Sequence, residues 1–185
     1  MEHLWIGTVN IGIVHPMAYP NLRNDEDVIA TIREIVEDDF FGAIEVANLS
    51  PGLVRKIGDM LKSAHIDVIY VGQDSLMRED VSLCSLDEVE RERAVELSKK
   101  NIDIAYQIGA SILTVSSGKD PGEQLREKAR GKLIASLKEL YRRLKVSLEN
   151  ASRQIKYEII QRLIEKIIVK GNTLEIEYNF PLLES

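Results

Sequence analysis

The chain has 185 residues, of which 44% are hydrophobic and 29% charged, so it can bury a globular core. Its formal net charge of -6 argues against a nucleic-acid interface, because phosphate binding requires clustered Lys and Arg. The single Cys84 cannot form an internal disulfide, and the apolar residues 4–14 are too short and interrupted to be a signal peptide or membrane span. We therefore expect a cytoplasmic protein without a nucleic-acid or membrane partner.

Four short apolar runs in the first 145 residues have the composition of strands. The first, residues 4–14, ends at His15, and the proline that follows it favours extended backbone before it. The other three runs are residues 42–46, 66–72 and 111–115. Runs of this length that are bounded by loops are consistent with buried strands.

Apolar residues at helical spacing follow each run and predict four helices. Their bounds are expected from capping residues and from glycine stops. The helices are expected from Asp25 as a cap, from Pro51 with Ser50 as the cap, from about Asp87 to Gly109, and over residues 123–144. The segments between strand and helix, such as residues 17–24 and 73–85, are expected to be loops.

Strands that alternate with helices predict a parallel sheet, because parallel neighbours need long, right-handed crossovers. The expected fold class is therefore α/β. A closed barrel of eight such units takes about 250 residues. This chain supplies four units before its pattern changes, so we expect a partial barrel, half of a closed one.

The pattern changes at about Val146. Residues 152–168 predict an amphipathic helix, because isoleucine and leucine recur there at helical spacing among charged residues. Residues 173–180 alternate apolar and polar side chains, which is the period of a half-buried strand. We therefore expect two domains, residues 1–145 and a helix–strand tail over residues 146–185.

Four stretches carry a family resemblance, namely residues 11–20, 37–45, 85–97 and 108–118. In sequence and in order they resemble the N-terminal half of the xylose-isomerase-like TIM barrel family, often called sugar phosphate isomerases and epimerases. The resemblance covers residues 6–144. It implies a truncated TIM barrel whose intact relatives isomerise or epimerise sugars.

The last part of the chain carries a second, shorter resemblance. Residues 148–182, in particular 148–152 and 159–178, resemble the C-terminal end of large serine recombinases. The catalytic serine domain, zinc ribbon and basic DNA-binding surface of those enzymes have no counterpart upstream, which disfavours a recombinase function. Together the two resemblances imply a fusion at about residue 146.

In a β/α barrel the working residues stand at the C-terminal ends of the strands. Glu45 is a candidate catalytic residue there, because a carboxylate between Ile44 and Val46 is costly to bury without a partner. His15 is a second catalytic candidate, with a hydrogen-bonded structural role as the alternative. Further strand-end residues are the candidate substrate ligands Gln73, Ser116 and Ser117, for which ordinary loop polarity is the alternative, together with Asn48 and Asp74.

The barrel resemblance also implies a divalent metal, Mg²⁺, Mn²⁺, Co²⁺ or Zn²⁺, which would polarise the substrate. Residues 146–149 resemble the fifth strand of the family, which ends in a metal-binding glutamate, so Glu149 is a candidate metal ligand. The residues after Glu149 depart from the family pattern. Most of the metal-binding constellation belongs to the second half of the barrel, and we therefore expect no bound metal in this chain.

Two functions fit these observations. The chain can be a truncated isomerase or epimerase that keeps half of a pocket for a sugar or sugar phosphate, with little or no catalysis. Alternatively, it is a non-catalytic interaction protein or a fusion remnant with a recombinase segment. The unpaired edges of a four-stranded sheet also predict self-association, with a homodimer as the first expectation.

Overall fold

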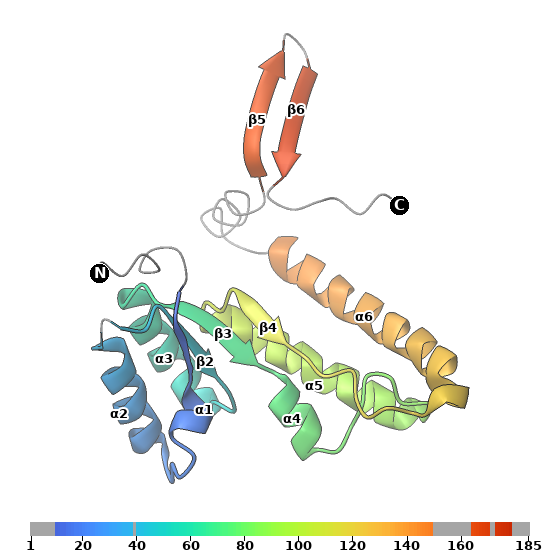
Figure 1. The fold of residues 1–185 in the computed structure, drawn as a ribbon, viewed down its shortest axis with the longest axis horizontal. Coiled ribbons are helices and arrows are strands. Elements are labelled where there is room, and N and C mark those ends of the chain that lie inside the picture. The colour runs from blue at the N-terminus through green and yellow to red at the C-terminus, as the bar shows by residue number, and fades with distance from the viewer. Residues whose placement is uncertain (1–9, 39, 150–163, 171–172, 179–185) are drawn as a thin grey trace, which may run out of the picture. The chain divides into compact units, whose positions relative to one another are not determined.

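The structure is a computed structural model of the full chain (Figure 1). It describes residues 10–38, 40–149, 164–170 and 173–178. The chain divides into two compact units, Met1–Leu140 and Tyr141–Ser185.

A parallel sheet of four strands forms the first unit (Figure 1). The strands lie in sequence order, β1-β2-β3-β4, and each pairs in parallel with the next. They are β1 (Gly12–Val14), β2 (Ala43–Val46), β3 (Asp67–Val71) and β4 (Ile112–Thr114). This confirms the predicted α/β fold, with a sheet that is consistent with a partial TIM barrel.

Helices follow each strand of this sheet. They are α1 (His15–Ala18), α2 (Asp25–Val36), α3 (Pro51–Ser63), α4 (Gln73–Arg78), α5 (Glu88–Gln107) and α6 (Arg126–Glu149), which follows the 3-10 turn Glu123–Leu125. The loop prediction was wrong for α1 and α4. Helices of four and six residues are too short to show an apolar period in sequence, and Pro16, the second residue of α1, has a backbone angle that suits a first turn.

One of the three predicted helix caps differs from the observed residue. The side chain of Asn24, not Asp25, caps α2 by accepting a hydrogen bond of 2.8 Å from the backbone amide of Asp27. Ser50 occupies the N-cap position of α3 as predicted, but its hydroxyl donates to the Asp25 carboxylate at 2.8 Å and makes no capping hydrogen bond. Asp87 caps α5 as predicted, accepting from two amides of the first turn.

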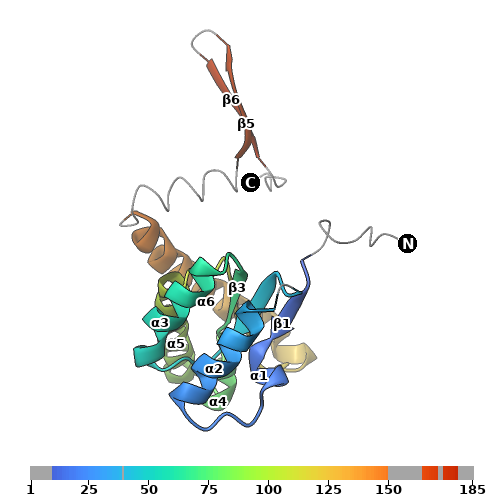
Figure 2. The same cartoon turned by 90° about the vertical axis from the view of Figure 1, so that its left-hand side faces the viewer.

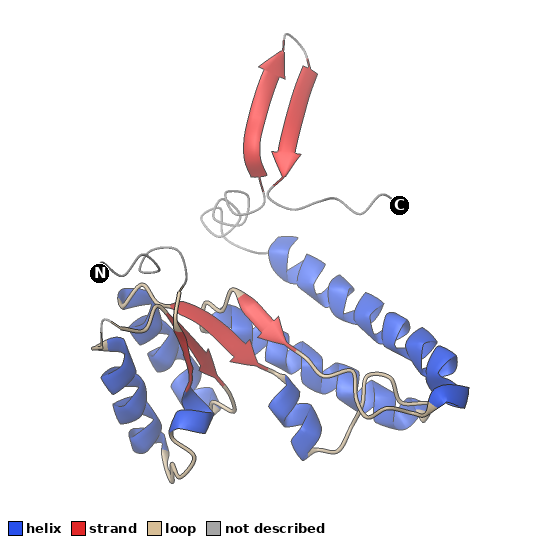
Figure 3. Cartoon of the chain, viewed as in Figure 1, coloured by secondary structure: helices blue, strands red, loops and turns tan. Residues whose placement is uncertain are grey.

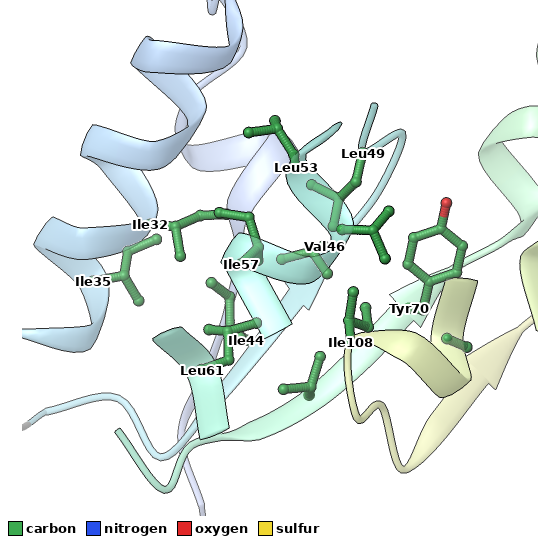
Figure 4. Close-up of a cluster of buried hydrophobic side chains, with 13 residues drawn as sticks. Ile32, Ile35, Ile44, Val46, Leu49, Leu53, Ile57, Leu61, Tyr70 and Ile108 are labelled. Atoms are coloured by element: carbon green, nitrogen blue, oxygen red, sulfur yellow. The ribbon is translucent and has the colours of Figure 1, made fainter. Parts of the chain in front are cut away.

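The main hydrophobic core lies between one face of the sheet and helices α2, α3 and α5 (Figures 2 and 4). Alternate residues of the central strands point into it, such as Ile44 and Val46 of β2, both fully buried. Their helical partners include Ile32, Ile35, Leu53, Ile57 and Leu61. Residues alternate between the faces of a strand, so the intervening residues of β2, Ala43 and Glu45, belong to the opposite face.

A second cluster joins α5 to the first part of α6. Leu140 of α6 is buried there with Val95 and Ile102 of α5. The buried guanidinium of Arg91 donates to Ser136 at 3.0 Å and to Glu139 at 3.0 Å, and the Ser136 hydroxyl donates to a backbone carbonyl at 2.8 Å. Residues 133–140 of α6 are therefore held by both apolar and charged contacts, which include Arg91 of α5.

The second unit contains an antiparallel hairpin of β5 (Ile164–Lys170) and β6 (Thr173–Tyr178). Strand β6 confirms the strand predicted from residue 173, as far as Tyr178. The helix predicted over residues 152–168 is wrong from Ile164 onward, where β5 begins, and its earlier part lies outside the described residues. Two residues separate the strands, and a Gly-Asn pair between apolar runs is a hairpin signal that helical spacing obscured.

Candidate functional site

The C-terminal ends of all four strands lie along one edge of the sheet, because the strands are parallel. The segments that follow these ends are α1, residues 47–50, α4 and residues 115–122, which appear in Figure 3 as short helices and loops. The residues predicted as site candidates in the first unit belong to these segments or to the C-terminal residues of a strand.

Glu45 lies on the face of the sheet opposite the main core. The strand register places Glu45 beside Val14 of β1 and Ile69 of β3, and Ile69 beside Ile112 of β4. Glu45 is half-buried and makes no hydrogen bond or ion pair with any residue that the structure describes. No described cation pairs with its carboxylate, and the catalytic role of Glu45 stays a prediction.

His15 occupies a different environment from Glu45. It is 4% exposed and shares a hydrogen bond of 2.9 Å with the Thr31 hydroxyl of α2, which lies on the helix-covered side. Its ring also packs on Tyr19, with centroids 5.5 Å apart. Burial lowers the pKa of the His15 imidazole below its ordinary value. These contacts fit the structural alternative for His15, and a catalytic role stays a prediction.

Asn48 and Asp74 meet at the ends of β2 and β3. The Asn48 side-chain amide donates to the Asp74 carboxylate, which also accepts from Arg78 at 3.2 Å. Asn48 has a φ of 51°, a left-handed backbone angle that asparagine tolerates better than most residues. The buried Tyr70 hydroxyl lies beside this group, accepts a hydrogen bond from the Asn48 backbone, and has its pKa raised by burial.

Gly72, the residue after β3, brings the ends of β3 and β4 close together. Its amide donates to the Thr114 carbonyl at 3.0 Å, and its carbonyl accepts from the side chains of Asn101 and Ser75 at 3.0 and 2.9 Å. A Cβ at this position would lie 2.8 Å from Leu113 and 2.9 Å from the Thr114 carbonyl oxygen. Only glycine fits here without displacing β4.

The end of β4 supplies Thr114 and the two predicted serines. The Thr114 hydroxyl is buried and has no hydrogen-bond partner among the described residues. The hydroxyl of Ser116 accepts from the Gly118 amide at 3.2 Å, and the carbonyl of Ser117 accepts from the Ser82 hydroxyl at 2.9 Å. Both serines thus support the loop in this structure, which fits the loop-polarity alternative, and their substrate role stays a prediction.

The remaining predicted residues lie on helices. Gln73 is exposed as the first residue of α4, beside Asp74. Glu149 is the last residue of α6, so residues 146–149 are helical and do not form the strand that they resemble in the family. The physical reason is an uninterrupted run of residues from Lys132 to Glu149 without glycine or proline, which allows the helix to continue.

Among residues 10–38, 40–149 and the two strands of the hairpin, no group of three His, Cys, Asp or Glu is placed to hold a metal. A divalent ion of this family usually needs several such donors. The described residues therefore do not fit a complete metal site, and we assign no step to a metal. The role of Glu149 as a ligand stays a prediction.

The model of the family named Xylose isomerase-like TIM barrel matches residues 10–167. The chain belongs to this family. No curated protein matches it. The family match continues past residue 145 and overlaps residues 148–167 of the segment that resembles serine recombinases, and that second resemblance stays a prediction.

Two solved structures are similar to this chain. One is an L-ribulose 3-epimerase, with a TM-score of 0.56 and 16% identity over 73% of this chain and 47% of that one. Another, from Anabaena variabilis, is described as a sugar phosphate isomerase/epimerase, with a TM-score of 0.49 and 15% identity over 74% of this chain and 51% of that one. This member of the xylose isomerase-like family thus spans about half the length of these structures.

No helix in the described part of this family member has the length and apolarity that a membrane crossing requires. Asn48 and Asp74, which the sequence placed at strand ends, are in contact in the structure. The sequence analysis did not identify Tyr70, Asn101 or Thr114. Asn101 had a usable signal, since it is a polar residue at a core-facing position of α5. Tyr70 and Thr114 had none, because their surroundings come from distant segments.

Proposed function

We propose that this chain forms half of the pocket of a sugar isomerase or epimerase and binds a sugar or sugar phosphate there, with little or no turnover by a single copy. The observation that carries the proposal is Glu45. It is the one ionisable side chain near the C-terminal ends on the open face of the described sheet, and it has no partner among the described residues.

Neighbouring polar groups support binding at the same edge. Asn48 and Asp74 present an amide and a carboxylate, both of which can hydrogen-bond to sugar hydroxyls. The Thr114 hydroxyl adds a buried group that lacks a protein partner among the described residues. The half-buried Val14 and Ile69 flank Glu45 and offer an apolar surface to the carbon atoms of a sugar ring or chain.

The expectation of little turnover follows from the number of proton-transfer groups. Moving a proton off one position of a sugar and onto another requires an acid and a base in reach of the reacting atoms. On the open face of the described sheet, Glu45 is joined only by Asp67, which lies at the opposite end of its strand and accepts from Asn10 at 3.0 Å. A single copy therefore provides one of the two groups.

Calorimetric titration with L-ribulose tests the binding, since one similar structure is an L-ribulose 3-epimerase. We expect Glu45→Gln to weaken binding by about tenfold or more, because a hydrogen bond to a charged group contributes roughly 1.5–3 kcal/mol. Glu92→Gln, an exposed carboxylate on α5, is the matched control and should bind as the unmodified chain does. Absence of any binding, or equal binding by Glu45→Gln, contradicts the proposal.

An epimer assay with Mg²⁺, Mn²⁺ or Co²⁺ tests the second part. We expect no product above background from the purified chain. A turnover that disappears in Glu45→Gln would contradict the proposed lack of catalysis while supporting the proposed pocket.

A further inference from the structure

Thr114, the last residue of β4, carries a hydroxyl that the fold leaves without a partner. The hydroxyl oxygen is buried and forms no hydrogen bond with any residue that the structure describes. A buried polar group without a hydrogen bond destabilises a folded protein, and such groups are rare. The Thr114 hydroxyl is therefore either a cost of this fold or a group that pairs with a ligand.

Thr114 belongs to the open face of the sheet, which also carries Glu45. Leu113, the residue before it, packs in the core, and neighbouring residues of a strand alternate between the two faces. The register pairs Glu45 with Ile69 and Ile69 with Ile112, and Thr114 stands two residues beyond Ile112 toward the C-terminal end. Thr114 and Glu45 thus share one face near the edge where the strands end.

The strand spacing gives the separation of these two residues. Neighbouring strands lie about 4.8 Å apart, and a strand advances about 3.3 Å per residue. Two strand spacings and two residues along the strand place the Cα atoms of Glu45 and Thr114 about 12 Å apart. Their side chains shorten this gap from both ends, so that one sugar can contact both residues.

The exposed part of Thr114 is not its hydroxyl. The residue is half-buried while its hydroxyl oxygen is buried, so the exposed area lies on its other atoms. The hydroxyl and the methyl group of threonine branch from one carbon, and a rotation of about 120° carries the hydroxyl to a neighbouring staggered position. Such a rotation can turn the hydroxyl toward the open face.

The backbone at the end of β4 is held in place, which confines the change to the side chain. The Thr114 carbonyl accepts from the Gly72 amide at 3.0 Å, and the Gly72 carbonyl accepts from the side chain of Asn101 at 3.0 Å. A Cβ at Gly72 would lie 2.9 Å from the Thr114 carbonyl oxygen, so the two strands are in close contact. Rotation about χ1 is therefore the freedom that Thr114 keeps.

We propose that Thr114 is a specificity-determining residue of the proposed pocket, whose side chain turns when a sugar binds and whose hydroxyl then pairs with a sugar hydroxyl. This inference rests on the proposed function, because Glu45 on the same face binds another part of the sugar. Without the sugar, the hydroxyl stays buried and unpaired. The bound sugar supplies the missing partner and thereby favours the turned side chain.

Two substitutions of threonine by valine test the unpaired hydroxyl. Thr114→Val keeps the branched shape and removes the unpaired group, so it should raise the melting temperature of the full chain by about 2–4 °C. Thr31→Val is the matched control and should lower the melting temperature, since the Thr31 hydroxyl pairs with His15 and with the Asp27 carbonyl. A lower melting temperature for Thr114→Val, or its failure to fold, overturns the proposal.

Calorimetric titration with L-ribulose tests the role in binding. Thr114→Val should bind L-ribulose about three- to tenfold more weakly than the unmodified chain, because one hydrogen bond is lost. Thr114→Ser keeps the hydroxyl and should bind nearly as tightly as the unmodified chain. Equal binding by Thr114→Val and the unmodified chain overturns this proposal and leaves the proposed function standing. An unmodified chain that binds no L-ribulose contradicts the proposed function, and the ligand of Thr114 with it.

The rotation itself has a direct readout in nuclear magnetic resonance. Three-bond couplings from the Thr114 methyl carbon to the backbone nitrogen and to the carbonyl carbon depend on χ1. We expect these couplings to change when the unmodified chain is saturated with L-ribulose. Binding of L-ribulose without a change in the couplings overturns the proposed rotation.

Discussion

The two faces of the four-stranded sheet have similar residue types and very different surroundings. Ile44 and Val46 of β2 are fully buried under α2 and α3, whereas Ile112 of β4 on the other face is 55% exposed. Parallel sheets are usually covered on both faces. This difference shows that the helices cover only the face of Ile44 and Val46. The face of Ile112 can be covered only by further strands or by a ligand.

Substitutions of isoleucine on the two faces should show the largest difference. Ile44→Ala removes a fully buried side chain from the core and should lower the free energy of unfolding by about 3 kcal/mol. Ile112→Ala removes an exposed side chain and should cost less than about 1 kcal/mol in the monomer. Urea unfolding at a concentration too low for association measures both, and equal losses would contradict the assignment of the covered face.

Two arginines on α5 extend the comparison to charged groups. Arg91 is buried between Glu88, Ser136 and Glu139, and Arg91→Met should cost on the order of 2 kcal/mol, since it leaves the buried Ser136 without a charged partner. Arg93 pairs with Glu79 in solvent, and Arg93→Met should cost under about 0.5 kcal/mol. Thermal unfolding of the two variants measures both losses. A larger loss of stability for Arg93→Met than for Arg91→Met would contradict the buried contact between Arg91 and α6.

His15 makes the covered side sensitive to acid. Burial lowers the pKa of His15 in the folded chain below the ordinary 6.5, so the unfolded chain binds the proton more readily. Stability contributed by the neutral ring is present above pH 6.5 and is lost as the pH falls toward the lowered pKa. His15→Gln should flatten the dependence of unfolding free energy on pH in this window, and an unchanged slope would contradict it.

Glu88 should show the smallest effect, because it is exposed. Hydrogen bonds from Arg91 and Lys132 lower its pKa from the ordinary 4.5 to about 2. Stability from the charged carboxylate is present above pH 4.5 and is lost as the pH falls through about 2. Glu88→Gln should reduce the slope of unfolding free energy between these values, with exposed Glu92→Gln as the control that leaves it unchanged.

Local patterns determined most of the first unit. Short apolar runs between loops specified the four strands, and the alternation with helices specified a parallel sheet, because each depends on residues that are close in sequence. The strand-end rule also located Glu45, Asn48 and Asp74 correctly as residues of one edge. In the second unit the same reasoning confused a strand with a helix, since a few isoleucines fit both periods.

Only the tertiary structure decided which of these residues meet. The partners of His15, Asp74 and Gly72 are 16, 26 and 29 residues away in sequence, and no local period encodes such contacts. The sequence by itself therefore determined the elements, their order and the edge where polar residues collect. Because the helices pack on one face of the sheet, His15 is buried against Thr31 of α2, whereas Glu45 on the other face stays uncovered. The surroundings of a side chain depend on which distant segment covers its face.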